Sequence, residues 1–120
     1  MKRAKASNPD FLNGVPELLI LQLLARQPMY GYELVQTIRR TTGQRLAFGE
    51  GCVYPILHRL ERDAILSGRH EQVGGRARIV YRLTPKGHKQ LERSASLWQE
   101  VVGAVNLVLR GGSDAQASLA

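Results

Sequence analysis

Apolar side chains recur every three or four residues along the last third of the chain. The run follows Thr84-Pro85, which is typical of a helix start because Thr caps the N-terminus and Pro is tolerated in the first turn. We therefore expect a long helix over about 85–110. Its seam consists of Leu91, Ala95, Trp98, Val102, Val105 and Leu109, with a second apolar row of Leu97, Val101, Ala104 and Val108 beside it. A chain of 120 residues holds one small domain, which cannot cover both rows, so we expect a two-fold homodimer.

The charge of the chain is strongly basic. Seventeen Lys and Arg residues against ten Asp and Glu give a net charge of +7, and such an excess attracts polyanions. The single cysteine, Cys52, cannot form an internal disulfide, which indicates a reducing compartment. No signal-peptide pattern opens the chain, and the longest apolar stretch, 18–25, is too short to span a bilayer. We expect a cytoplasmic protein with no membrane contact.

Three shorter helices are predicted before the long one. The first begins at Pro16 and is apolar on nearly every face, so we expect Leu18 and Leu21 to join the dimer interface. A second helix follows Gln27-Pro28, and 46–48 has the composition of a very short strand.

The third helix is predicted over about 52–64. Its inward face carries Val53, Leu57 and Leu60, which recur at helical spacing. The opposite face carries small residues and bases, namely Gly51, Pro55, His58, Arg59 and Arg62. Tyr54 lies at the edge of that face.

Residues 66–83 change from helical to alternating periodicity. Gly74-Gly75 separates two short runs and predicts a two-residue hairpin turn. Arg76 and Arg78 follow the glycines, so the tip of the hairpin is basic. Such a tip fits a minor groove, whose negative potential attracts arginine.

This order of elements predicts a mainly α fold with a small β-hairpin (α+β). Helices two and three read as a helix-turn-helix, whose second member enters the major groove of double-stranded DNA. His58, Arg59 and Arg62 can reach either base edges or phosphates, and we expect Arg76 to contact a phosphate. The predicted DNA-binding residues are Gly51, Cys52, Tyr54, Pro55, His58, Arg59, Arg62, Arg76 and Arg78.

Four motifs together resemble the PadR family of bacterial transcriptional regulators. They are Tyr30-Gly31-Tyr32-Glu33-Leu34, the pattern from Gly51 through Tyr54-Pro55 to Arg59-Leu60-Glu61, Gly74-Gly75-Arg76, and Tyr81-Arg82-Leu83-Thr84 with Gly87. The resemblance implies a winged helix-turn-helix with a C-terminal dimerisation helix, and a repressor released by a small molecule. The chain looks like the short subtype, with one such helix. It departs from the family at Cys52, where Thr or Ser is usual, and at Asp63-Ala64, where Gly is usual in the second position.

The resulting domain prediction has four parts: a basic arm (1–13), a winged helix-turn-helix domain (14–84), a dimerisation helix (85–110) and a tail (111–120). Trp98, the only tryptophan, is either an interface anchor or one wall of a pocket for a small aromatic effector, as the family resemblance suggests. Cys52 is either a replaced Thr or a redox-sensitive thiol. We expect a palindromic DNA operator as partner.

An enzyme is not expected. The three histidines have no metal-ligand spacing, and no phosphate-binding glycine loop is present. We predict neither a cofactor nor a metal. The alternative function is that of a non-specific, nucleoid-type basic protein, which would bind unrelated duplexes equally.

Overall fold

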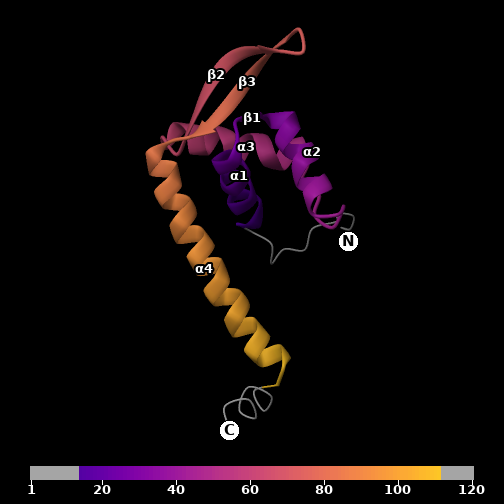
Figure 1. The fold of residues 1–120 in the computed structure, drawn as a ribbon, viewed down its shortest axis with the longest axis vertical. Helices are drawn as coiled ribbons and strands as arrows, with labels where there is room; N and C mark the ends of the chain where they lie inside the picture. The colour runs from indigo at the N-terminus through magenta and orange to yellow at the C-terminus, as the bar shows by residue number, and fades with distance from the viewer. Residues whose placement is uncertain (1–13, 112–120) are drawn as a thin grey trace.

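The computed structural model describes residues 14–111 and has the predicted α+β composition (Figure 1). The predicted arm (1–13) and residues 112–120 of the tail lie outside the described residues. The elements are α1 (Val15–Arg26), β1 (Met29–Tyr30), α2 (Gly31–Thr41), α3 (Glu50–Arg62), β2 (Leu66–Val73), β3 (Arg76–Leu83) and α4 (Pro85–Leu109). None of the described helices is long and apolar enough to cross a membrane.

The core joins α1, α2 and α3 to the base of the sheet. The residues with almost no exposed surface include Ile20, Leu21, Leu34, Ile38, Val53, Leu57, Leu60, Leu66 and Tyr81. The inward face predicted for α3 is therefore confirmed. Leu21 corrects the sequence-based interface prediction, because it is 0% exposed within its own subunit and has no surface left for a partner. Its neighbour Leu18 is only half-buried.

The sheet is antiparallel in the order β1-β3-β2. The short strand expected at 46–48 does not form; that segment is non-regular and buries Phe48 in the core. A two-residue strand instead follows α1, where Met29 pairs with Tyr81 and Tyr30 with Val80. This strand was not predicted because its hydrogen-bonding partner lies about 50 residues further along the chain.

The hairpin formed by β2 and β3, called the wing below, has the predicted two-residue turn. Val73 pairs with Arg76, and Gly74 and Gly75 have φ angles of 59° and 80°. A tight turn of this kind requires left-handed backbone at both positions, which glycine adopts without steric cost. In Figure 1 the wing rises above α3 and extends away from the body.

The C-terminus of α3 is closed by backbone hydrogen bonds in a Schellman arrangement. Ile65 N–H donates to the Leu60 carbonyl (2.9 Å) and Ala64 N–H to the Glu61 carbonyl (3.0 Å). Ala64 therefore has a φ of 63°, in the left-handed region. The departure from the family's usual glycine at this position predicts a helix end that is built differently. The chain nevertheless forms a Schellman turn, with alanine in the left-handed position.

Helix α4 begins with the predicted cap, since the Thr84 hydroxyl oxygen accepts from Gly87 N–H at 3.0 Å. Its first half packs beside α1, and its second half extends beyond the body of the domain (Figure 1). Most apolar residues of that second half stay exposed in the single chain. The exposed large ones are Leu97, Trp98, Val101, Val105, Leu107, Val108 and Leu109, whereas Val102 is half-buried.

Candidate nucleic-acid interface

The outer face of α3 carries five of the predicted contact residues on its surface. All five are exposed, namely Gly51, Pro55, His58, Arg59 and Arg62. Gly51 and Pro55 present little side-chain bulk, so a phosphate can approach the helix backbone closely. Open space around Gly51 supports this, because no atom lies within 4 Å of the position a Cβ would occupy there.

One flank of α3 and the wing line a common hollow of about 240 Å³. Tyr54 and His58 come from α3, and Ala77, Arg78 and Ile79 come from β3. The outer face of α3, through His58, and the basic strand of the wing therefore border the same space. Tyr30, Gly31 and Tyr81 complete the lining.

Tyr54 reaches this hollow because α2 begins with a glycine. A Cβ on Gly31 would overlap the Tyr54 ring, so the Tyr-Gly-Tyr motif makes room for an aromatic side chain of α3. Burial, and to a lesser extent the charge of Glu50, raise the pKa of the Tyr54 phenol, although Arg78 opposes the shift. The hydroxyl is thus protonated at neutral pH and available as a hydrogen-bond donor.

The two arginines of the wing differ in their surroundings. Arg76 is exposed at the tip. Arg78 is partly buried; its guanidinium carbon lies 4.6 Å from the ring centroid of Tyr30, a cation–π arrangement. Its Nε atom is buried without a hydrogen-bond partner among residues 14–111. Sequence reasoning missed Tyr30, because the contact depends on the pairing of β1 with β3.

The opposite flank of α3 is turned toward α1. There Arg59 Nη2 donates to Glu17 Oε1 at 2.7 Å, so this arginine has a protein partner. Cys52 is partly buried, and burial raises the pKa of its thiol. A raised pKa disfavours the redox interpretation, which requires a stabilised thiolate. Neither residue lies in the hollow beside the wing.

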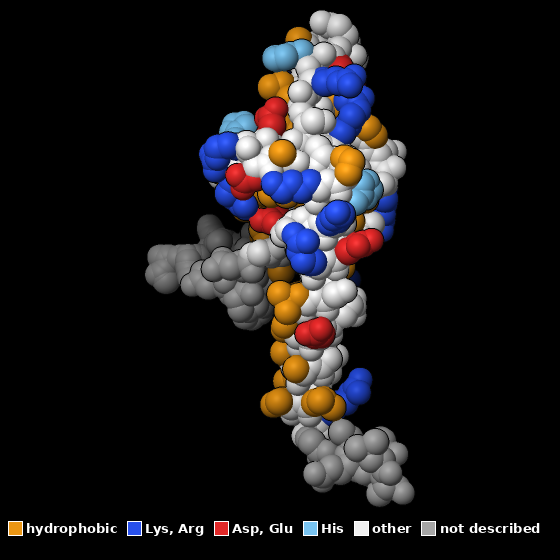
Figure 2. All heavy atoms as spheres, turned by 90° about the vertical axis from the view of Figure 1, so that its left-hand side faces the viewer, with side chains coloured by type: hydrophobic (Ala, Val, Ile, Leu, Met, Phe, Trp, Pro, Cys, Tyr) orange, Lys and Arg blue, Asp and Glu red, His pale blue; other side chains and the backbone are white. Residues whose placement is uncertain are grey.

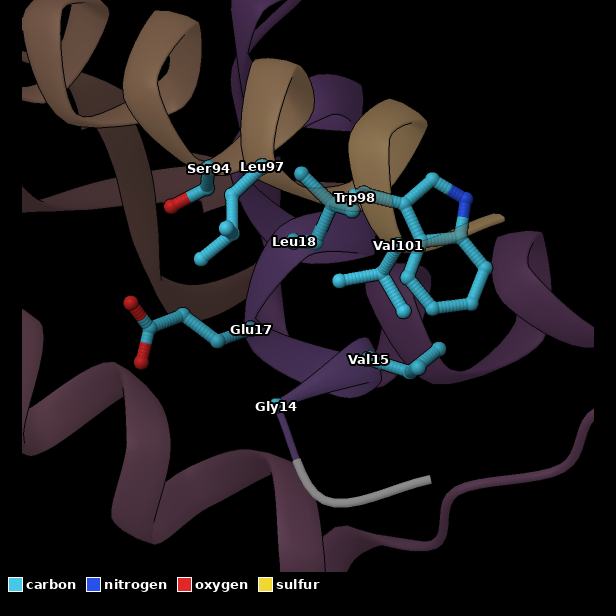
Figure 3. A pocket seen from close by; sticks show the side chains of 8 residues that line it. All are labelled: Gly14, Val15, Glu17, Leu18, Ser94, Leu97, Trp98 and Val101. Carbon is cyan, nitrogen blue, oxygen red and sulfur yellow. The ribbon is translucent and has the colours of Figure 1, made fainter. Parts of the chain in front are cut away.

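A second concavity, called the α1–α4 groove below, lies between α1 and the middle of α4 and has a volume of about 370 Å³ (Figure 3). Trp98 forms one side of it and is 41% exposed in the single chain. Leu18, a predicted interface residue, lies opposite on α1. The complete lining is Gly14, Val15, Glu17, Leu18, Ser94, Leu97, Trp98 and Val101.

Figure 2 shows how charge and apolar surface separate along the molecule. Lysine and arginine side chains gather around the upper body, whereas hydrophobic side chains follow one side of the lower half of α4. In the part of the chain that the structure describes, no group of three or more His, Cys, Asp or Glu side chains is placed to hold a metal ion.

A helix-turn-helix followed by a basic two-stranded wing defines the winged-helix class of DNA-binding proteins. Residues 20–93 match the Transcriptional regulator PadR-like family, and the chain belongs to this family. Transcriptional regulator Rv3488 of Mycobacterium tuberculosis is 36% identical over 96 residues, which cover 80% of this chain and 87% of the relative.

Solved structures agree with this assignment. A PadR-like transcriptional regulator from Bacillus cereus superposes with a TM-score of 0.75 at 32% identity, covering 86% of this chain and 99% of the other. A transcriptional regulator from Clostridium thermocellum gives a TM-score of 0.75 at 28% identity, covering 82% and 96%. The fold predicted from the sequence and the family resemblance are both confirmed.

Proposed function

We propose that this chain is a homodimeric, sequence-specific regulator that binds a palindromic double-stranded DNA operator and represses transcription until a small molecule releases it. The hollow shared by α3 and the wing carries the DNA-binding part of this proposal. Three tyrosines, a histidine and an arginine line it beside the exposed outer face of α3. Helix and wing can therefore contact one duplex together.

Dimerisation is supported by the exposed apolar side of α4. Leu109 is 76% and Val108 77% exposed in the single chain, and no described segment of the same chain covers them. An apolar strip of this length needs a partner in water. A two-fold axis along α4 would bury the strips of two chains against each other and present two recognition helices to two half-sites.

The effector part of the proposal rests on the α1–α4 groove. Its volume lies in the range of small-molecule sites, and most of its lining is apolar with one indole. We assign it a planar aromatic ligand, which would stack on Trp98. Because the groove adjoins the proposed dimer interface, a ligand there would change the spacing of the two recognition helices.

A binding experiment tests the operator proposal. Fluorescence anisotropy with duplex from the upstream region of the chain's own gene, against scrambled duplex at about 0.15 M salt, should show at least a thousandfold preference. Equal affinities would support the non-specific alternative. Titration with aromatic compounds should quench Trp98 emission and weaken operator binding together, because the two equilibria are linked. Quenching without loss of affinity would contradict effector release.

A further inference from the structure

The ion pair between Arg59 and Glu17 joins the recognition helix to the first helix of the domain. The two residues are 42 positions apart, and a single 2.7 Å hydrogen bond connects their side chains. Both remain partly accessible, with side-chain exposures of 45% for Arg59 and 23% for Glu17. An ion pair this exposed contributes little to stability, since water and salt compete with it.

Arg59 starts from the same outer surface of α3 as the residues proposed to meet DNA. It lies about one turn after Pro55 and about one turn before Arg62, and both of these side chains are exposed. Its guanidinium nevertheless ends at α1, where the Glu17 carboxylate neutralises it. A guanidinium binds phosphate through two parallel hydrogen bonds. A DNA phosphate therefore competes strongly with the Glu17 carboxylate for Arg59.

We propose that Glu17 is a specificity-determining residue that withholds Arg59 from non-specific phosphate contacts. This inference rests on the proposed DNA-binding function. On unrelated duplex, α3 does not contact matching bases. Arg59 then keeps its ion pair with Glu17 and does not contribute to DNA affinity. On the operator, the closer fit of α3 brings Arg59 within reach of DNA, and the ion pair is exchanged. Glu17 thus acts as a repulsive element against wrong sites.

The test is a double-mutant cycle on scrambled duplex, measured across a salt series. Glu17→Gln keeps the size of the side chain and removes its charge. Each freed arginine that meets a phosphate steepens the slope of log K against log salt by about 0.9, so a dimer should gain roughly two. We expect scrambled duplex to bind about three- to tenfold more tightly at low salt, whereas operator affinity changes less. In the Arg59→Ala background, Glu17→Gln should leave the slope unchanged.

Two controls separate this role from general effects. Glu100→Gln removes the same charge from an exposed position on α4 and should leave the slope as it is in the wild type. Melting temperatures show whether the ion pair is merely structural: a lower melting temperature for Glu17→Gln with an unchanged slope would overturn the proposal. A slope that steepens equally with and without Arg59 would also overturn it. Absence of any duplex binding by the wild type would instead contradict the proposed function.

Discussion

The Arg78 guanidinium lies over the ring of Tyr30 in the hollow between the wing and α3, with its carbon 4.6 Å from the ring centroid. The two residues come from neighbouring strands, because Tyr30 pairs with Val80. The Tyr30 ring restricts the orientation of the Arg78 side chain but leaves its positive charge intact. The Glu17 carboxylate, in contrast, neutralises the charge of Arg59. If Arg78 contacts a phosphate as we propose, its contact with Tyr30 reduces the side-chain entropy that binding would cost.

The first prediction concerns this stacking. Tyr30→Leu should weaken duplex binding about two- to fivefold, because it removes a cation–π contact worth about 0.5–1 kcal/mol and leaves the Arg78 side chain to be ordered on binding. Tyr30→Phe keeps the ring and should bind like the wild type. Fluorescence anisotropy measures both affinities. Equal loss in the two variants would show that the hydroxyl, and not the ring, is the important group.

A second prediction separates folding from binding at Gly51. Alanine at this exposed helical position meets no neighbour within 4 Å, and it should raise the free energy of unfolding by up to about 1 kcal/mol because Ala favours helix over Gly. The added methyl group should nevertheless weaken DNA binding, since it blocks close approach of a phosphate to the backbone. Urea unfolding and anisotropy give the two values. A variant that is more stable and binds equally well would remove Gly51 from the interface.

The strained end of α3 leads to a third prediction. Ala64→Gly should stabilise the protein by about 1 kcal/mol, because glycine adopts the left-handed backbone of this position without penalty. Ala25→Gly, inside α1, is the matched control and should destabilise by a similar amount. Urea unfolding at one protein concentration compares them, since the stability of a dimer depends on concentration. Destabilisation by both substitutions would contradict the strain argument.

The fourth prediction tests the proposed dimer interface on α4 by substituting two residues that are adjacent in the sequence. Val108→Asp places a charge on the apolar side of α4 and should shift light scattering from twice the chain mass to 13.3 kDa. Leu107→Asp is the control, because Leu107 lies two turns after Glu100 on the same side of the helix, which carries a charge and faces away from Trp98. Both residues are exposed in the single chain, at 77% and 52%. A dimer that survives Val108→Asp would require a different interface.

The last prediction follows from the raised pKa of the Cys52 thiol. Burial disfavours the thiolate, so at pH 7–8 the native thiol should react with Ellman's reagent more slowly than free cysteine. The rate should rise as the pH passes the ordinary thiol value of about 8.5 and approaches the higher native value. Unfolding in urea should remove the protection. Loss of DNA binding after mild peroxide treatment would show that Cys52 is a redox switch after all.

Local patterns predicted most of the secondary structure. The inward spacing of Val53, Leu57 and Leu60 placed α3, Gly74-Gly75 placed the turn of the wing, and Thr84-Pro85 placed the start of α4. Each of these signals depends on residues within a few positions of one another, so the chemistry that decides the outcome is contained in the local sequence.

The contacts of individual side chains were predicted less well. Leu21 belongs to the core and not to an interface, because α2, α4 and β3 of the same chain pack around α1. Periodicity cannot specify which faces of an apolar helix its own subunit covers. Helical phase placed Arg59 on the outer surface of α3, but it did not reveal Glu17 as its partner. Tyr54 was predicted at the edge of the outer face of α3. That Gly31 leaves space for its ring depends on how α2 packs against α3, which the sequence does not show.

The sequence alone therefore determined the order of the four helices and the hairpin, the turn of the wing and the excess of positive charge, because these depend on short-range periodicity and composition. Only the tertiary structure decided which arginine is stacked and which is neutralised. Arg78 meets Tyr30, and Arg59 meets Glu17, across separations of 48 and 42 residues. The energy of such contacts depends on distances of a few ångströms, which are set when the elements pack and not by neighbours along the chain.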